Sequence, residues 1–157
     1  MPSPKAEFFR IVQIGPFRYP VHFNFRTGPA RPADAGGKVR QERLFMTMAE
    51  VADILKADVL VKGEGGHKAI RHVVASDLMS DVLLVDEEDM LLLTSLASDQ
   101  VPRTAQIVGA VGVIVVNGKP LPSSMVNVAN DLRMTLATCR LSKYDACVAV
   151  HAALGPS

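Results

Sequence analysis

The sequence predicts an α/β domain, a three-layer sandwich with a mainly parallel sheet, preceded by a poorly ordered N-terminal arm. Short runs rich in Val, Ile and Leu alternate with segments whose apolar residues recur at helical spacing, which is the pattern of βα repeats. The run at residues 110–116 is almost wholly apolar, as in a strand that is covered on both faces. The chain has 157 residues, 48% of them hydrophobic, so it can bury a core of one domain.

Residues 1–45 form the expected arm. They contain all six phenylalanines and are broken repeatedly by proline, and no helical periodicity survives in them. Residues 1–43 carry eight basic and three acidic side chains, a net charge of +5, which leaves −4 for the rest of a chain whose net charge is +1. Alternating apolar and polar residues between 17 and 26 make a short strand or hairpin conceivable.

Two interpretations of the arm compete. Basic residues interleaved with aromatic ones can bind single-stranded nucleic acid. The simpler interpretation is a loose arm, or a non-native extension from a start codon placed too early, and it is the one we adopt. Nucleic acid is therefore not an expected partner.

The domain is expected to span residues 46–157 and to begin with a capped helix. Thr47 and Glu50 have the spacing of a capping box, and Val51, Ile54 and Leu55 supply the apolar face of a helix that continues through residue 56. A strand at residues 58–62 and a glycine-rich turn at residues 63–66 follow. Such a turn can cradle phosphate, but no Gly-Lys-Ser/Thr follows it, so we interpret it as an ordinary turn.

The next segment, residues 73–85, is a strand that turns sharply into a helix. Ser76 and Asp77 stand at the junction, and both residue types are good N-caps. Leu78, Val82 and Val85 recur at helical spacing and are expected to face inward.

The rest of the chain repeats this alternation. Residues 86–89 are four consecutive acids, expected in a solvated loop rather than around a metal ion. Strands are expected at residues 90–94, 110–116 and 134–138. Helices are expected from Ser98 to residue 108, from Ser123 or Ser124 to residue 131, and from Ser142 to residue 154.

Residues 74–83, with the sequence Val-Ala-Ser-Asp-Leu-Met-Ser-Asp-Val-Leu, resemble the core of DRTGG domains. The resemblance extends through residues 91–94, 103–105, 117–120 and 144–147 and covers roughly residues 46–154. The Asp-Arg-Thr-Gly-Gly run that names the family is absent, and residues 69–73 stand in its place. The resemblance implies a regulatory or accessory module related to the N-terminal domain of HPr kinase. Similar modules accompany CBS domains in pyrophosphatases, which makes an adenine nucleotide the first ligand class to test.

Polar residues follow each expected parallel strand, and ligands of open parallel sheets bind outside the carboxyl ends of the strands. Hydroxyl groups, helix N-termini and basic side chains there could hold a nucleotide or another anion. The alternative is that these residues only cap helices and turns. The candidate ligand-binding residues are Ser76, Asp77, Thr94, Ser95, Asn117, Gly118, Lys119 and Thr138, with Ser98, Arg140 and Ser142 near them.

Catalytic motifs are not found. The chain has neither a Gly-x-Ser-x-Gly elbow nor a P-loop, so hydrolase and kinase chemistry are not expected of it. The four histidines and two cysteines lack metal-ligand spacing, and we expect no metal, no cofactor and reduced thiols. No apolar run is long enough to span a bilayer and no signal sequence is evident, so a cytoplasmic protein is expected.

The functional prediction is a non-catalytic regulatory module that binds a small anionic ligand or a partner protein, which could be an enzyme. The alternatives are a structural homodimerisation module without a ligand and an enzyme of unrecognised chemistry. A homodimer is expected because the last helix is apolar on more than one face, where a soluble monomer would keep polar residues.

Overall fold

The computed structural model describes residues 10–14, 17–21 and 45–154. The chain divides into two compact units, residues 1–40 and residues 41–157, and each is described by itself. In the first unit, β1 (Arg10–Ile14) and β2 (Phe17–Val21) form an antiparallel hairpin, with Arg10 opposite Val21 and Ile14 opposite Phe17. Apart from Phe45, the rest of the predicted arm lies outside the described residues.

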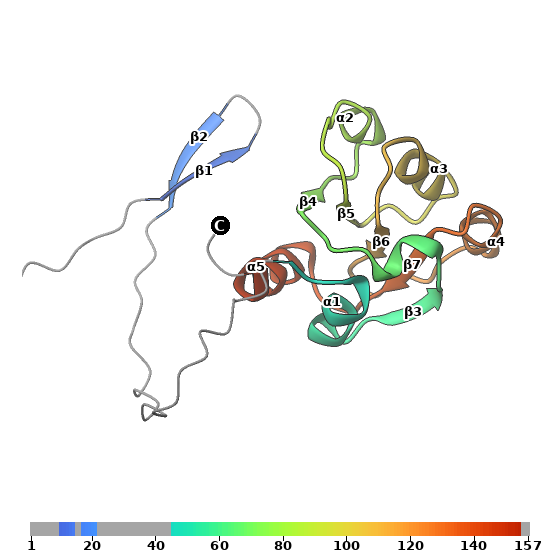
Figure 1. Cartoon of the computed structure of the whole chain (residues 1–157). Coiled ribbons are helices and arrows are strands. Elements are labelled where there is room, and N and C mark those ends of the chain that lie inside the picture. Colours follow the sequence, from blue (N-terminus) through green and yellow to red (C-terminus); the bar gives the residue numbers. More distant parts are fainter. Residues whose placement is uncertain (1–9, 15–16, 22–44, 155–157) are drawn as a thin grey trace, which may run out of the picture. The chain divides into compact units, whose positions relative to one another are not determined.

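The second unit is built on one five-stranded sheet. Its strands lie in the order β3-β7-β6-β5-β4 (Figure 1). Neighbours from β4 to β7 are parallel, and β3 is antiparallel to β7, with an irregularity in register between Val59 and Val61. The strands are β3 (Asp58–Val61), β4 (His72–Ala75), β5 (Met90–Thr94), β6 (Gly112–Val115) and β7 (Thr135–Thr138).

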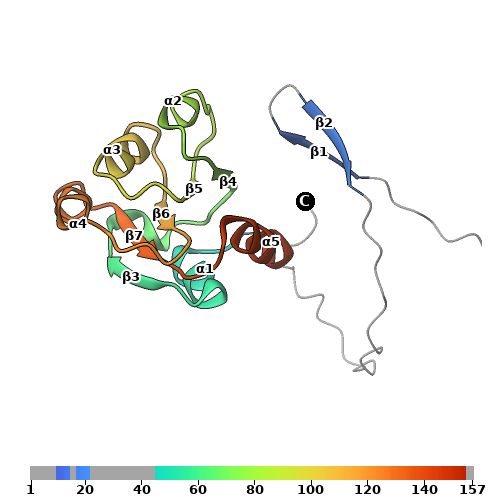
Figure 2. The same ribbon diagram turned by 180° about the vertical axis from the view of Figure 1, so that it is seen from behind.

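Helices cover both faces of this sheet, which gives the predicted three layers. The helices are α1 (Met48–Leu55), α2 (Met79–Val82), α3 (Gln100–Ile107), α4 (Ser123–Asp131) and α5 (Lys143–Leu154). The view along the strands shows α2, α3 and α4 on one side and α1 and α5 on the other, as does the view from behind (Figures 1 and 2). Placing successive crossover helices on one face follows from right-handed βαβ connections.

Two apolar cores result from the alternation of side chains along the strands. Leu91 and Leu93 of β5 belong to the core beneath α1 and α5, whereas Met90 and Leu92 belong to the core beneath the other three helices. All of β5 and β6 is buried. Both strands were predicted from their continuous apolar runs, and the predicted fold class is confirmed.

Two helix starts differ from the prediction. Helix α2 is a single turn that begins at Met79, so Leu78 stays outside it and is 58% exposed instead of facing inward. Helix α4 begins at Ser123 after Pro122, and no serine side chain caps it, although Ser123 or Ser124 was predicted to do so. The serines are dispensable there because the fixed φ of proline already suits a helix start. In α1, Val51 and Leu55 are buried as predicted, but Ile54 is 41% exposed.

The glycine-rich turn connects β3 with β4 and begins beside β7. It contains a short 3-10 helix, η1 (Glu64–His67), and the N–H of Gly63 donates to the Thr135 hydroxyl over 3.0 Å. A Cβ atom on Gly63 would collide with the backbone of Arg133 and Thr135. Close backbone contact, rather than phosphate binding, therefore explains this glycine.

Candidate functional site

The carboxyl ends of β4, β5, β6 and β7 meet at one margin of the sheet, as their parallel register requires. All eight predicted ligand-binding residues lie at or just beyond these ends. The structure divides them into two groups that share Lys119. One group surrounds the Asp77 carboxylate, and the other lines a hollow at the ends of β6 and β7.

Asp77 is the centre of the first group. Its carboxylate accepts hydrogen bonds from the Thr94 hydroxyl (2.9 Å), from the Ser95 N–H (2.6 Å) and from the Ser95 hydroxyl (2.7 Å). The Lys143 ammonium group forms an ion pair with it. Asp77 thus ties the end of β4 to the end of β5 and to the first turn of α5. The prediction that Asp77 caps the following helix was wrong, because α2 starts only at Met79.

Electrostatics keep this carboxyl ionised. Partial burial alone raises the pKa of Asp77, but the hydrogen bonds from Lys143, Ser95 and Thr94 outweigh that effect and hold the pKa well below its usual range. Nearly half of the side chain remains exposed, so solvent screens these interactions. Asp77 is therefore a fixed negative charge and a positioning group.

Two serines near this group serve the local backbone, as the capping alternative proposed. The Ser76 hydroxyl accepts from the Leu78 N–H over 3.1 Å, and the Ser98 hydroxyl accepts from the Gln100 N–H over 3.3 Å. Both bonds span two residues, a pattern typical of serine turns. Ser142 caps α5 as predicted, since its hydroxyl accepts from the Asp145 N–H over 3.1 Å.

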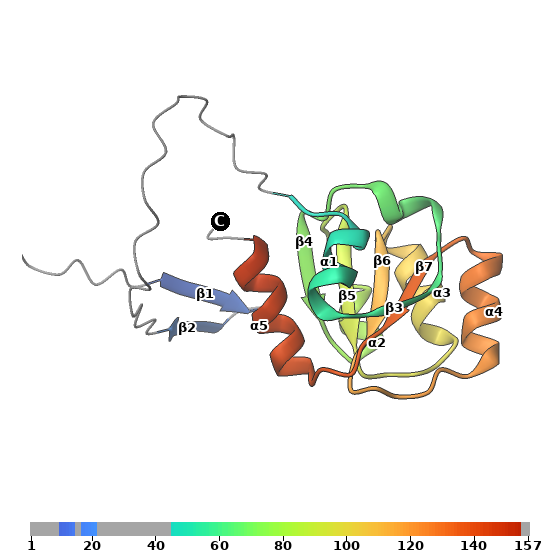
Figure 3. The ribbon, with the colours of Figure 1, turned by 90° about the horizontal axis from the view of Figure 1, so that it is seen from below.

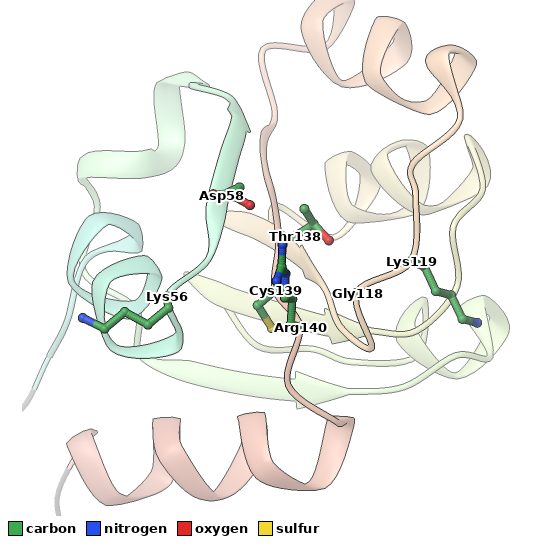
Figure 4. Close-up of a pocket in the computed structure, with 7 residues that line it drawn as sticks. All are labelled: Lys56, Asp58, Gly118, Lys119, Thr138, Cys139 and Arg140. Atoms are coloured by element: carbon green, nitrogen blue, oxygen red, sulfur yellow. The ribbon is translucent and has the colours of Figure 1, made fainter.

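The second group lines a hollow of about 140 Å³ (Figure 4). Its residues come from three places: the end of α1 and the start of β3, the turn after β6, and the end of β7. They are Lys56, Asp58, Gly118, Lys119, Thr138, Cys139 and Arg140. The volume is smaller than the ~300–1,000 Å³ of typical ligand pockets, so it suits a phosphate-sized group rather than a whole nucleotide.

The turn after β6 holds one wall of the hollow in place. Asn117 and Gly118 both have left-handed backbone conformations, with φ of 68° and 59°. The N–H of Asn117 donates to the Leu141 carbonyl over 2.7 Å, and that of Gly118 donates to the Cys139 carbonyl over 2.8 Å. These two N–H groups are thereby occupied, and Asn117 is a turn residue that does not line the hollow.

The residues that line this hollow carry a net positive charge. Its lining carries the cations Lys56, Lys119 and Arg140 against the single carboxylate of Asp58. Lys119 donates through Nζ to the Ser95 carbonyl over 2.8 Å, which links the two groups. Figure 4 shows Lys56 and Lys119 directed outward on opposite sides, with Arg140 between them. Within the described part of the chain Arg140 has no ion-pair partner.

Two of the polar residues that line the hollow with Arg140 are neutral, Thr138 and Cys139. The Thr138 hydroxyl donates to the Val115 carbonyl over 3.2 Å and keeps its lone pairs. Burial raises the pKa of the Cys139 thiol, so this side chain stays protonated and uncharged. The arrangement can hold an anion through a guanidinium group, which suits the oxygens of a phosphate group.

Four residues of these groups were not predicted: Lys56, Asp58, Cys139 and Lys143. Cys139 directly follows the predicted residue Thr138. Lys56 and Asp58 arrive through β3, which runs antiparallel to its neighbour and so brings its start to the carboxyl ends of the other strands. Lys143 was predicted only as a polar position of the last helix. Local sequence carries no signal for either contact, because both depend on strand direction and helix placement.

Among residues 45–154, no group of three or more His, Cys, Asp or Glu side chains is placed so that it could hold a metal ion. Within the described ranges, no helix combines the length and apolar character needed to cross a membrane.

A five-stranded, mainly parallel sheet covered by helices on both faces, with a cation-lined hollow at its strand ends, defines a small three-layer α/β domain. No family model and no curated protein matches the chain. Two solved chains do match, and one is the CBS and DRTGG domains of the regulatory region of Clostridium perfringens pyrophosphatase, complexed with its activator diadenosine tetraphosphate. The TM-score is 0.53 at 15% identity, and the match covers 66% of this chain but only 45% of that chain. The comparison shows a shared fold, in agreement with the resemblance predicted from the sequence.

Proposed function

We propose that this protein is a non-catalytic regulatory module that binds a phosphate-bearing small molecule at the carboxyl ends of its parallel strands. One observation carries the proposal: Arg140 lies between Lys56 and Lys119 at the hollow, without an ion-pair partner in the described structure. Basic side chains around a concave surface attract anions. A phosphate group would supply the oxygens that the Arg140 guanidinium lacks.

An adenine nucleotide is the ligand class that we propose. The pyrophosphatase regulatory region that shares the fold was solved with diadenosine tetraphosphate, described as its activator. The match covers less than half of that protein, and the proposal therefore extends only to the class of ligand. The thermal unfolding experiment below identifies the base and the number of phosphate groups. The hollow of about 140 Å³ takes the phosphate group, and the nucleoside then lies along the carboxyl ends of the neighbouring strands.

A second candidate is a structural homodimerisation module without a ligand. Exposed apolar side chains favour it, since Leu84 is 83% exposed and Tyr144 is 77% exposed. A partner enzyme regulated by the module is compatible with either candidate.

Thermal unfolding with added ligands separates the two candidates. ATP, diadenosine tetraphosphate, inorganic phosphate and adenosine are the four probes. A ligand that binds only the folded state stabilises it by about 2.7 kcal/mol at a hundredfold excess over Kd. We expect at least one nucleotide to raise the unfolding midpoint, phosphate to act weakly, and adenosine to have no effect.

Arg140→Gln is the diagnostic variant. Loss of charge-assisted hydrogen bonds should weaken nucleotide binding at least tenfold, because each such bond contributes roughly 1.5–3 kcal/mol. Lys119→Ala should also weaken binding. Arg103→Gln is the matched control, since Arg103 is an exposed arginine of α3 outside the hollow. No response to any nucleotide, or equal weakening by Arg140→Gln and Arg103→Gln, contradicts the proposed site.

A further inference from the structure

Asp58 lines the hollow, and the phosphate site proposed above gives it no role. A carboxylate repels a phosphate group, so Asp58 opposes the charge of the ligand unless it binds another group of the same ligand. In Figure 4, Asp58, Thr138 and Arg140 lie together in the middle of the view. Within the described residues, the Asp58 side chain takes part in neither an ion pair nor a hydrogen bond, so its oxygens are available to a ligand.

The backbone of β3 holds Asp58 in this position. Viewed from below, β4, β5, β6 and β7 lie side by side, and the chain enters β3 from α1 (Figure 3). Asp58 is the first residue of β3 and lies opposite Thr138, the last residue of β7. Side chains of opposite residues project from the same face of a sheet, so these two form one wall of the hollow. The register irregularity between Val59 and Val61 follows directly, and such bulges often re-aim side chains beside active sites.

The wall of Asp58 and Thr138 offers hydrogen-bond acceptors to the hollow. A carboxylate accepts hydrogen bonds and does not donate. The Thr138 hydroxyl donates its one proton to the Val115 carbonyl, so toward the hollow it can only accept. A phosphate group bound to Arg140 is itself an acceptor, and it leaves this wall without a donor. The complementary ligand therefore carries hydrogen-bond donors next to its phosphate group.

We propose that Asp58 determines the specificity of the site by accepting a hydrogen bond from a ribose hydroxyl of the nucleotide, with the Thr138 hydroxyl as a second acceptor; this inference rests on the proposed function. The two hydroxyls of a ribose are neighbouring donors, just as the wall presents neighbouring acceptors. The ribose adjoins the first phosphate, so it reaches this wall when Arg140 holds that phosphate. A carboxylate that binds ribose hydroxyls is also found in dinucleotide-binding folds. The ligand class is thereby narrowed to ribonucleotides.

The exposure of Asp58 sets the size of the expected effect. A fully buried site that hydrogen-bonds a hydroxyl rejects an analogue without it by roughly 10⁴-fold, because buried polar groups are left unpaired. Asp58 is exposed, so water replaces a missing hydroxyl. We therefore expect a discrimination of about tenfold, the lower end for a hydrogen bond to a charged group.

Isothermal titration calorimetry of the full chain with ATP, dideoxy-ATP and inorganic triphosphate tests this role. Dideoxy-ATP lacks both ribose hydroxyls, and triphosphate lacks the whole nucleoside. The wild-type chain should bind ATP about tenfold more tightly than dideoxy-ATP. In Asp58→Ala the two dissociation constants should differ by less than about twofold, because the charged acceptor is gone. Triphosphate should bind Asp58→Ala more tightly than wild type, because a repelling charge has been removed.

Asp53→Ala is the matched control, since Asp53 is an exposed aspartate of α1 outside the hollow. It should leave the ratio of the ATP and dideoxy-ATP dissociation constants unchanged. Asp58→Asn separates hydrogen bonding from charge, because its amide oxygen still accepts. Its ratio should lie between those of wild type and Asp58→Ala. Equal ratios in Asp58→Asn and Asp58→Ala would show that Asp58 acts through its charge alone and overturn the hydrogen-bonding role.

The outcomes distinguish this inference from the proposed function. A wild-type chain that binds ATP and dideoxy-ATP equally overturns the role of Asp58 and leaves the phosphate site in place. An Asp58→Ala chain that keeps the wild-type ratio does the same, and it shows that Asp58 only balances the charge of the neighbouring cations. If ATP does not bind the wild-type chain, the inference falls, and thermal unfolding with the four probes named above decides whether the proposed function falls with it.

Discussion

At the scale of single residues, the least expected feature is the role of Asp77. Its position before a helix predicted a cap, yet its carboxylate binds the backbone and side chains of Thr94 and Ser95 and the ammonium group of Lys143. A local pattern can show that an Asp suits a cap, but it cannot show that a lysine 66 positions later ends up beside it. Ser76 was predicted as a helix N-cap or a ligand-binding residue, and its hydroxyl instead accepts from the Leu78 N–H, two residues later, in the turn before α2.

The depressed pKa of Asp77 gives a prediction with a definite sign. Because the folded pKa lies below the unfolded value, the carboxylate stabilises the fold above roughly pH 3.9, and this contribution is lost as the pH falls through the folded pKa. Asp77→Asn should therefore lower the free energy of unfolding by about 1 kcal/mol at neutral pH, the upper end for exposed ion pairs. The difference from wild type should shrink in strong acid.

Urea unfolding at a series of pH values measures this difference. Asp81→Asn is the control, since Asp81 is exposed on α2 and has no ion pair in the described structure. A difference that stays constant or grows toward low pH would show that Asp77 acts through packing and not through its charge.

At the scale of elements, two helix starts provide a comparison. Before α1, the Thr47 hydroxyl accepts from the Glu50 N–H, and the Thr47 N–H donates to the Glu50 carboxylate over 2.8 Å. Before α4, no side chain caps the helix. Thr47→Ala should lower the free energy of unfolding by about 1 kcal/mol, whereas Ser124→Ala should change it by only a few tenths. Equal losses in chemical denaturation would contradict the assignment of the cap.

Long, strongly patterned elements were predicted well and short ones poorly. The strands β5 and β6 are continuous apolar runs, and the last helix has a Ser-Asp cap, so each could be placed from sequence alone. In contrast, α2 is a single turn, and three apolar residues at helical spacing suggested a longer helix. Leu78 and Val85 have the spacing of residues on one helix face, but both lie outside α2.

At the scale of the whole molecule, the βα repeats predicted that β4 to β7 are parallel, because a helix between two strands returns the chain to run in the same direction. The order of the strands was not predicted. The repeats also did not predict that β3 is antiparallel, since a single strand carries no signal of its direction. The hollow depends on that direction, as Lys56 and Asp58 enter it only through β3. Two of the seven lining residues could therefore not be predicted from local pattern.

The predicted domain start makes a whole-molecule prediction. A chain that starts at Met46 should unfold with the same midpoint and cooperativity as the full chain, because the capping box and both described cores lie within residues 46–154. Differential scanning calorimetry of the two chains makes the comparison. A midpoint lowered by several degrees would show that residues 1–45 stabilise the domain.

The position of β3 in the sheet also sets the order in which the protein can assemble during synthesis. Hydrogen bonds between the ends of adjacent parallel strands and their loops span 17 to 24 residues, but the bond from Gly63 to Thr135 spans 72. Helix α1 and β3 leave the ribosome first among the elements of the domain, yet β7, the strand that β3 pairs with, is the last strand to be made. Closing so long a loop costs entropy that local pairing does not incur. A nascent chain released before Thr135 would keep β3 unpaired, with Val59 and Leu60 available to other chains, so this domain completes its fold only when its final strand has been translated.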